Sequence, residues 1–169
     1  MLDSALVRKE FLENFHEFEY FHDIDGDFPQ DPTYKCVMLI QDEKHTKHAP
    51  KFTKTCAEIL KNFRHTTVFQ AFFSIMDGPK FMAPHKNEEA DESLRYVLGV
   101  HISPHDDGVL RYRGADRLFV QDEWFIFDTC QLHSVRKTQD YQRVVLMIDF
   151  LPYDDATRSM KRKSSTRSW

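Results

Sequence analysis

Two histidines, one serine and one arginine in this sequence could form a metal site next to a binding site for a carboxylate. His85, His133 and Arg143 each lie on what reads as an apolar β segment, and Ser74 lies on another such segment upstream. Neutral imidazole binds Fe, Zn, Cu or Ni, and two histidines on neighbouring strands leave several coordination positions open. A guanidinium binds a carboxylate through two parallel hydrogen bonds. These residues therefore predict a metal bound beside a carboxylate ligand.

The carboxylate that usually completes such an iron site is missing from its expected place. It typically lies two residues after the first histidine, where this chain has Asn87. A rival set exists, because His105 and Asp107 form an H-x-D motif that could join His133. The segment 103–108 is dense in turn residues, which predicts the tip of a loop. The histidine pair without a carboxylate is therefore favoured.

The elements that must position these residues fall into two groups. Phe11, Phe15 and Phe18 have helical spacing and predict a helix over 4–21, and a second helix is expected over 53–63. From residue 66 onward, short β-rich segments are separated by turn residues. Strands are expected over 35–40, 67–76, 94–103, 109–113, 117–120, 123–127, 132–136 and 143–150. Many closely spaced strands after two helices predict a β-sandwich or barrel.

Two polar segments are not expected to carry the function. The run 23–27 alternates acidic residues as a calcium loop does, but Phe28 and Tyr34 occupy the positions that require glycine and glutamate. A polar turn is therefore expected there. The segment 157–169 is basic with few apolar groups, which predicts a flexible tail.

Composition limits the class of protein. The chain has 169 residues, of which 41% are hydrophobic and 14% aromatic, enough to bury one core of ordinary size. Its formal net charge is −4, which lacks the basic excess that binding to a phosphate backbone requires. We therefore expect a single domain that does not bind nucleic acid.

Cysteine usage and hydropathy indicate a compartment. Cys36, Cys56 and Cys130 are odd in number and form no C-x-x-C pair, which is typical of a reducing environment. No apolar run approaches the roughly 18 residues that a membrane span needs. The first residues carry an acidic side chain and no apolar signal-peptide core. A cytoplasmic protein with no membrane span is expected.

The order of the motifs resembles the aspartyl/asparaginyl β-hydroxylase family. The family pattern is a serine, a first histidine, Leu-Arg-x-His-Leu-Gly, Phe-Asp-Asp-x-x-x-His and a later arginine. It maps here onto Ser74, His85, the segment 94–99, the segment 127–133 and Arg143. The ordered set is more specific than any one motif, and it covers residues 72 to about 152, roughly half of the chain.

This resemblance implies a fold. It is a mainly β double-stranded β-helix, a cupin-like jelly roll with flanking N-terminal helices. The single oxygenase domain would span 1–156, with its core over about 66–152.

The resemblance also implies a chemistry. Members are Fe(II)/2-oxoglutarate-dependent dioxygenases that lack the usual carboxylate ligand. His85 and His133 would hold Fe(II). Arg143 and Ser74 would bind the distal carboxylate of 2-oxoglutarate, and Arg95 would face the same cavity. The implied reaction uses O2 to hydroxylate a C–H bond of an amino-acid-like, peptidyl or other small acidic substrate, with release of succinate and CO2.

Three residues near the implied cavity depart from the family pattern. Val97 replaces its second histidine, Thr129 replaces its second Asp, and Asn87 stands where glycine is usual. The substrate therefore need not be an aspartyl or asparaginyl side chain. Candidate substrate-binding residues are Asn87, Val97 and His101, the last because it shares strand parity with Val97. The acidic segment 86–93 is expected to be a mouth loop that either selects a cationic substrate or is simply solvated.

Two other classes of protein are compatible with the sequence. One is a non-catalytic cupin-like module that binds a metal or a carboxylate without turnover. The other is a scaffold protein in which the N-terminal helix and the basic tail carry the function. Succinate production would separate an enzyme from the first class, and dispensable histidines would support the second.

Overall fold

The computed structural model describes residues 1–15, 33–87 and 93–152. Its helices are α1 (Ser4–Asn14), a 3-10 turn η2 (Ala49–Lys51) and α2 (Thr53–Asn62). Its strands are β1 (Tyr34–Gln41), β2 (Lys44–His45), β3 (Thr66–Met76), β4 (Lys80–His85), β5 (Leu94–His101), β6 (Val109–Tyr112), β7 (Ala115–Leu118), β8 (Trp124–Asp128), β9 (His133–Lys137) and β10 (Arg143–Pro152). The predicted polar turn over 23–27 and the predicted tail over 157–169 lie outside the described residues.

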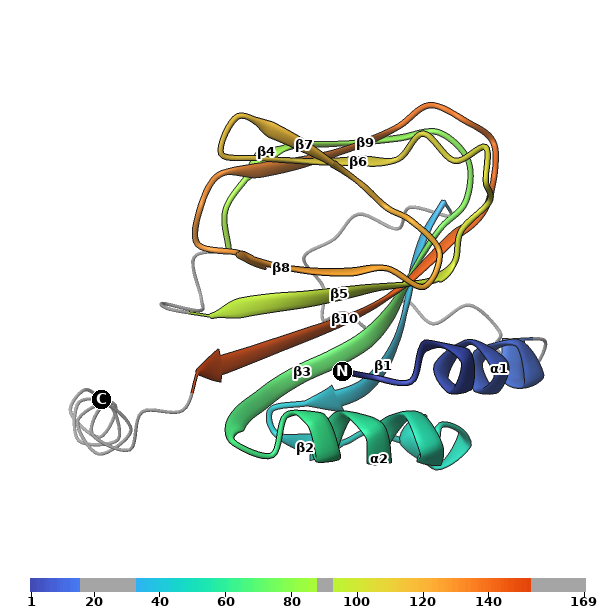
Figure 1. Ribbon diagram of the computed structural model, residues 1–169, viewed down its shortest axis with the longest axis vertical. Coiled ribbons are helices and arrows are strands. Elements are labelled where there is room, and N and C mark those ends of the chain that lie inside the picture. The colour runs from blue at the N-terminus through green and yellow to red at the C-terminus, as the bar shows by residue number, and fades with distance from the viewer. Residues whose placement is uncertain (16–32, 88–92, 153–169) are drawn as a thin grey trace.

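The strands form two antiparallel sheets that face each other (Figure 1). The larger sheet has the order β2-β1-β3-β10-β5-β8, and the smaller one has the order β4-β9-β6-β7. Helices α1 and α2 cover the face of the larger sheet that points away from the smaller one (Figure 1). This arrangement confirms the predicted mainly β jelly roll with N-terminal helices.

The larger sheet is buried on both faces, which explains why its central strand reads as a continuous apolar run. Along β10, Leu146 and Ile148 belong to the core beneath the helices, whereas Val145 belongs to the core between the sheets. Phe73 on β3 lies in the core beneath the helices, with its ring centroid 4.8 Å from that of Phe11 on α1. Apolar side chains on both faces are typical of a strand that is covered on both sides.

The structure gives bounds to one further strand, β4, and confirms the strand expected over 35–40 as β1. Strand β4 ends at His85, whose segment reads as β in the sequence but without strand bounds, because an edge strand that is buried on neither face and contains Pro84 gives a weak pattern. Strand β1 pairs with β3 through seven residues, so the larger sheet begins before residue 66, where the sequence placed the start of the core.

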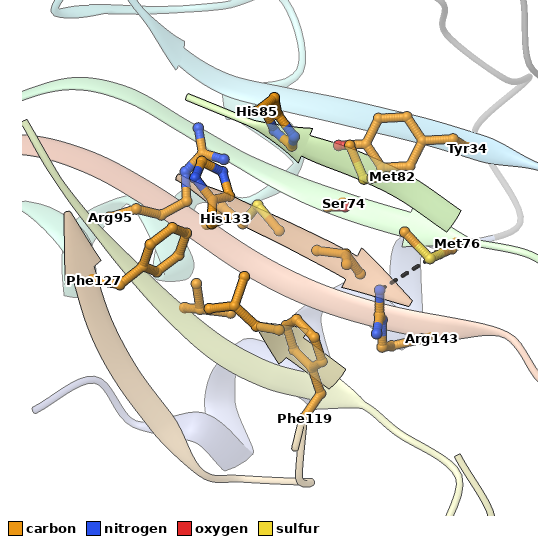
Figure 2. A pocket seen from close by; sticks show the side chains of 14 residues that line it. Tyr34, Ser74, Met76, Met82, His85, Arg95, Phe119, Phe127, His133 and Arg143 are labelled. Carbon is orange, nitrogen blue, oxygen red and sulfur yellow. Dashed lines mark hydrogen bonds between the residues drawn. The ribbon is translucent and has the colours of Figure 1, made fainter. Parts of the chain in front are cut away.

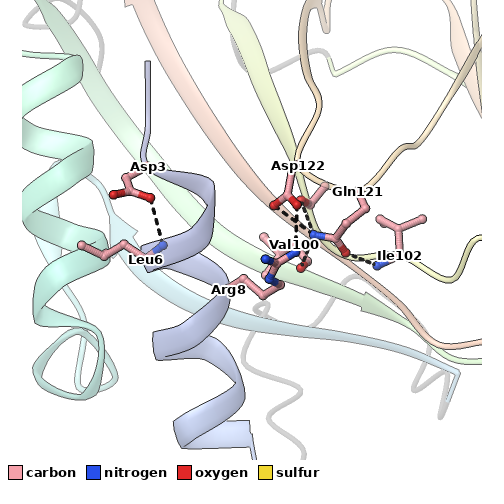
Figure 3. Close-up of polar contacts among 8 residues, drawn as sticks. Asp3, Leu6, Arg8, Val100, Ile102, Gln121 and Asp122 are labelled. Atoms are coloured by element: carbon pink, nitrogen blue, oxygen red, sulfur yellow. Dashed lines mark hydrogen bonds and ion pairs between the residues drawn. The ribbon is translucent and has the colours of Figure 1, made fainter.

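Helix α1 is attached to the sheet by polar contacts at its N-terminal end (Figure 3). The side chain of Asp3 accepts a hydrogen bond from the backbone N–H of Leu6 at 3.0 Å and so caps the helix. Arg8 forms an ion pair with Asp122 at 2.8 Å, in the turn that precedes β8. The helix is therefore held to the end of the sheet where β5 finishes.

A β-bulge at this end of β5 changes which side chains face the other sheet. Val145 on β10 pairs with Gly99 and Val144 pairs with His101, so β5 carries one extra residue here. The side chain of Gln121 donates to the carbonyl of Val100 and accepts from the N–H of Ile102, each at 2.9 Å (Figure 3). Ile102 then packs between the sheets. The alternation of side chains is therefore broken immediately before His101.

Among the residues that the structure describes, no helix has the length and apolar character to cross a membrane.

Candidate functional site

A pocket opens between the two sheets and brings together six residues that the sequence singled out (Figure 2). Its volume is about 440 Å3 when the space open to solvent is included. The six residues are Ser74, His85, Arg95, Val97, His133 and Arg143. Apolar side chains from both sheets fill the space between them, so charged groups in the pocket are partly shielded from water.

The two histidines of the pocket are direct cross-strand neighbours. His85 on β4 pairs with His133 on β9, and their ring centroids are 4.3 Å apart. Nδ1 of His85 lies 2.8 Å from the carbonyl oxygen of Ala83, and Nδ1 of His133 lies 2.9 Å from that of Gln131. Since a carbonyl only accepts, each Nδ1 carries a proton, and in the neutral ring the lone pair is therefore on Nε2. Both imidazoles therefore have the form that binds a metal through Nε2.

The environment of His133 favours the neutral ring. Burial lowers its pKa below the ordinary value, and the nearby charges of His85 and Arg95 act in the same direction. The hydrogen bond to Gln131 opposes this shift only in part. An uncharged imidazole at neutral pH is the state that coordinates a cation.

The rival metal site is not assembled. In the described parts of the chain, no group of three or more His, Cys, Asp or Glu side chains could hold a metal ion. His105 is exposed, with its ring near that of Tyr141. Asp107 accepts hydrogen bonds from the N–H of Thr138 at 2.9 Å and of Gln139 at 3.1 Å, and also from the hydroxyl of Thr138. This carboxylate therefore joins two loops.

Asp107→Ala is expected to leave the affinity for Mn(II) unchanged while lowering the melting temperature. Its hydrogen bonds hold the pKa of Asp107 at about 2, below the ordinary value of about 3.9. The stabilisation is therefore present above the unfolded-state pKa and is lost as the pH falls toward 2. Thermal melts of the wild type and of Asp107→Ala between neutral and acid pH should show a difference in melting temperature that disappears as the pH falls. A large loss of Mn(II) affinity would instead support the rival site.

The guanidinium of Arg143 is buried at the other end of the pocket without a strong partner. Nη2 donates to Sδ of Met76 at 3.0 Å, and a thioether is a weak acceptor. Nη1 is buried and has no hydrogen-bond partner among the described residues, and the ring of Phe119 lies 4.0 Å from Cζ. Burial lowers the pKa of Arg143 to about 10, so the group is still a cation at neutral pH. The charges of Asp106 and Asp107 act on this guanidinium, but Nη1 still has no hydrogen-bond partner among the described residues, so the group fits an anionic ligand.

The backbone leaves room for this guanidinium only because residue 108 is glycine. A Cβ at Gly108 would lie 2.1 Å from Nη1 of Arg143 and 2.6 Å from Oδ1 of Asp106. Asp106 itself accepts a hydrogen bond from the N–H of Gly108 at 2.6 Å. The loop between β5 and β6 therefore fits closely around the arginine.

Arg95 lines the pocket but is already engaged by a carboxylate. Its Nε and Nη2 donate to the two carboxylate oxygens of Asp149 at 2.6 and 2.7 Å, a bidentate pair between neighbouring strands. This edge of the guanidinium is therefore not free for 2-oxoglutarate, although its charge remains beside the histidines.

The three predicted substrate-binding residues lie in different places. Val97 is buried and lines the pocket on the same face as Arg95. Asn87 follows β4 and donates its N–H to the carbonyl of Thr129 at 3.0 Å, but its side chain does not line the pocket. The structure also does not bring His101 to the pocket, because the bulge in β5 leaves it exposed. Most of the acidic mouth segment, residues 88–92, lies outside the described residues.

Sequence reasoning missed Tyr34, Met76 and Phe119, which also line the pocket. Tyr34 begins β1, and only the pairing of β1 with β3 places it beside Ser74. Alternation along β1 could have indicated that Tyr34 and Cys36 share a face, but it says nothing about which strand lies next to them. The position of Tyr34 in the pocket therefore depends on a contact between segments that are far apart in the sequence.

The sequence matches the family model "Aspartyl/Asparaginyl beta-hydroxylase" over residues 3–152. This match covers most of the chain, so the chain belongs to that family, which confirms the resemblance seen in the motifs. No curated protein matches the sequence.

Solved structures confirm the fold at low sequence identity. The protein is similar to a prolyl-4-hydroxylase from Pseudomonas putida, with a TM-score of 0.56 and 17% identity over 90% of this chain and 89% of that chain. It is also similar to an oxidoreductase of the 2OG-Fe(II) oxygenase family from Burkholderia pseudomallei, with a TM-score of 0.55 and 13% identity over 75% of this chain and 73% of that chain. Family and fold together support an oxygenase of the hydroxylase class.

Proposed function

We propose that the protein is an Fe(II)/2-oxoglutarate-dependent dioxygenase that hydroxylates a C–H bond and releases succinate and CO2. The observation that carries this proposal is the content of one pocket. It holds two imidazoles whose Nε2 atoms make no hydrogen bond and, among the described residues, no carboxylate ligand, together with a buried guanidinium that has an N–H group without a partner in the same part of the chain. These residues fit a metal ion and an anionic cosubstrate in the same cavity.

Different residues of the pocket would bind the metal and the cosubstrate. His85 and His133 would hold Fe(II) through Nε2, since their Nδ1 atoms are held by backbone carbonyls. Iron and 2-oxoglutarate, when bound, would supply the oxidation by O2 that the side chains cannot perform. Arg143 would bind and orient the distal carboxylate, and Ser74 would add one hydroxyl donor. The apolar walls would exclude water around the charged ends.

The substrate that this proposal implies is amino-acid-like, peptidyl or another small acid. The charge of Arg95 is paired with Asp149, so the buried guanidinium of Arg143 is the cation that supports an anionic group on the cosubstrate. Val97 presents an apolar wall where the family pattern has a histidine, which supports a substrate other than an aspartyl or asparaginyl side chain. Cys36, Cys56 and Cys130 form no disulfide, which supports a cytoplasmic location.

The wild-type protein is expected to convert 2-oxoglutarate to succinate in the presence of Fe(II) and O2. Succinate should be measured by mass spectrometry, with and without a panel of amino acids and peptides. The panel is needed because the conversion of 2-oxoglutarate in such enzymes often depends on a bound substrate. Omission of iron or of O2 should abolish the product. Binding of 2-oxoglutarate without succinate under any condition would instead indicate the non-catalytic cupin-like module. Failure to bind 2-oxoglutarate in the presence of Mn(II) would contradict the proposal.

A further inference from the structure

We propose that the hydroxyl of Tyr34 is a third donor to the distal carboxylate of 2-oxoglutarate and so helps to select a dicarboxylate cosubstrate. This inference rests on the proposed function, because it assigns a further residue to the same pocket. Neither the sequence motifs nor the family pattern described above include Tyr34.

Strand pairing places Tyr34 in one row with Arg143. Tyr34 on β1 pairs with Met76 on β3, and Met76 pairs with Arg143 on β10. In the next row, Cys36 pairs with Ser74. Cross-strand partners and their diagonal neighbours are within reach of a long aromatic side chain. Ser74 is therefore a diagonal neighbour of Tyr34 on the adjacent strand, and Arg143 lies two strands away in the same row, close enough for Tyr34 to act on its charge.

The hydroxyl end of Tyr34 points into the pocket (Figure 2). Its polar neighbours are the side chains of Ser74 and Cys36. Burial raises the pKa of the phenol above its ordinary value, and the pKa of the Cys36 thiol is raised to about 11 by the same cause. The phenol therefore keeps its proton at neutral pH and can donate it in a hydrogen bond to an anion.

Arg143 alone does not satisfy a carboxylate. A carboxylate has two oxygens with about four lone-pair sites, and a guanidinium fork occupies about two of them. The weak contact from Arg143 to the thioether of Met76 is easily exchanged for a stronger acceptor. The hydroxyls of Ser74 and Tyr34 are the nearby donors that can occupy the remaining sites. Arg143, Ser74 and Tyr34 all line the same pocket, and together they would supply the donors for the distal carboxylate of 2-oxoglutarate.

Tyr34→Phe removes the donor and keeps the ring, so it tests the hydroxyl itself. Affinities for two probes should be measured by calorimetry with Mn(II) and without O2. One probe is 2-oxoglutarate, and the other is 2-oxopentanoate, which has the same keto acid end but no distal carboxylate. The variant should bind 2-oxoglutarate roughly tenfold more weakly, as expected for a lost hydrogen bond to a charged group. Its affinity for 2-oxopentanoate should not change.

Tyr96→Phe is the matched control. Tyr96 belongs to the core beneath the helices, on the opposite face of the same sheet, and its buried hydroxyl has no partner among the described residues. The same chemical change there should leave both affinities intact. Tyr34→Met, which also lacks the donor, serves as a second variant if thermal melts show that Tyr34→Phe is not folded.

The outcomes separate this inference from the proposed function. A folded Tyr34 variant that binds 2-oxoglutarate like the wild type would overturn the role of the hydroxyl and leave the proposed function standing. An equal loss for both probes would also overturn it, because it would indicate a packing role. If the wild-type protein does not bind 2-oxoglutarate at all, the proposed function fails first.

Discussion

Alanine at either His85 or His133 is expected to abolish the Fe(II)-dependent conversion of 2-oxoglutarate to succinate. The described residues offer two histidine ligands and no carboxylate, so the loss of one imidazole would leave a single ligand, which cannot hold a catalytic metal. Loss of groups that merely orient metal ligands already costs about 10- to 100-fold in metal affinity, so the loss of a ligand should exceed this range. Succinate release and Mn(II) affinity should therefore be measured on the same samples.

His101→Ala is the matched control for these two variants. His101 lies on β5, where it is exposed and does not line the pocket. The same loss of an imidazole there should change neither Mn(II) affinity nor succinate release. Full activity of His85→Ala or of His133→Ala, in a protein that melts normally, would refute the assignment of the metal site.

Arg143→Lys is expected to weaken 2-oxoglutarate binding by about tenfold or more while leaving Mn(II) affinity nearly unchanged. An ammonium group keeps the charge but cannot reproduce two parallel hydrogen bonds to one carboxylate. The site is also buried, where a strongly hydrated ammonium is less favourable than a guanidinium. Calorimetric titration of the variant with each ligand in turn measures the two effects separately.

The comparison with Arg111→Lys provides a control for this substitution. Arg111 lies on β6 and forms an exposed ion pair with Asp116, away from the residues that line the pocket. The conservative change there should have little effect on either ligand. Equal losses of 2-oxoglutarate and Mn(II) affinity in Arg143→Lys would indicate that Arg143 only maintains the fold.

The sequence by itself determined the class of fold and the types of residue at the site. Strand-length apolar segments separated by turn residues predicted a mainly β protein, and the structure confirms it. The order of Ser74, His85, His133 and Arg143 predicted a shared site, and the structure brings these four residues into one pocket. Such signals are local, because alternation and motif spacing are properties of neighbouring residues in the chain.

The tertiary structure alone decided which side chains are free to act. Only the pairing of β5 with β10 shows that Arg95 is held by Asp149, and only the bulge in the same pair turns His101 away from the pocket. The position of Tyr34 depends in the same way on the pairing of β1 with β3. Register and bulges arise from contacts between segments far apart in sequence. One inserted residue moves the side chains of the residues after it to the opposite face of the sheet. Local periodicity cannot report them, since it describes each strand before its neighbours are known.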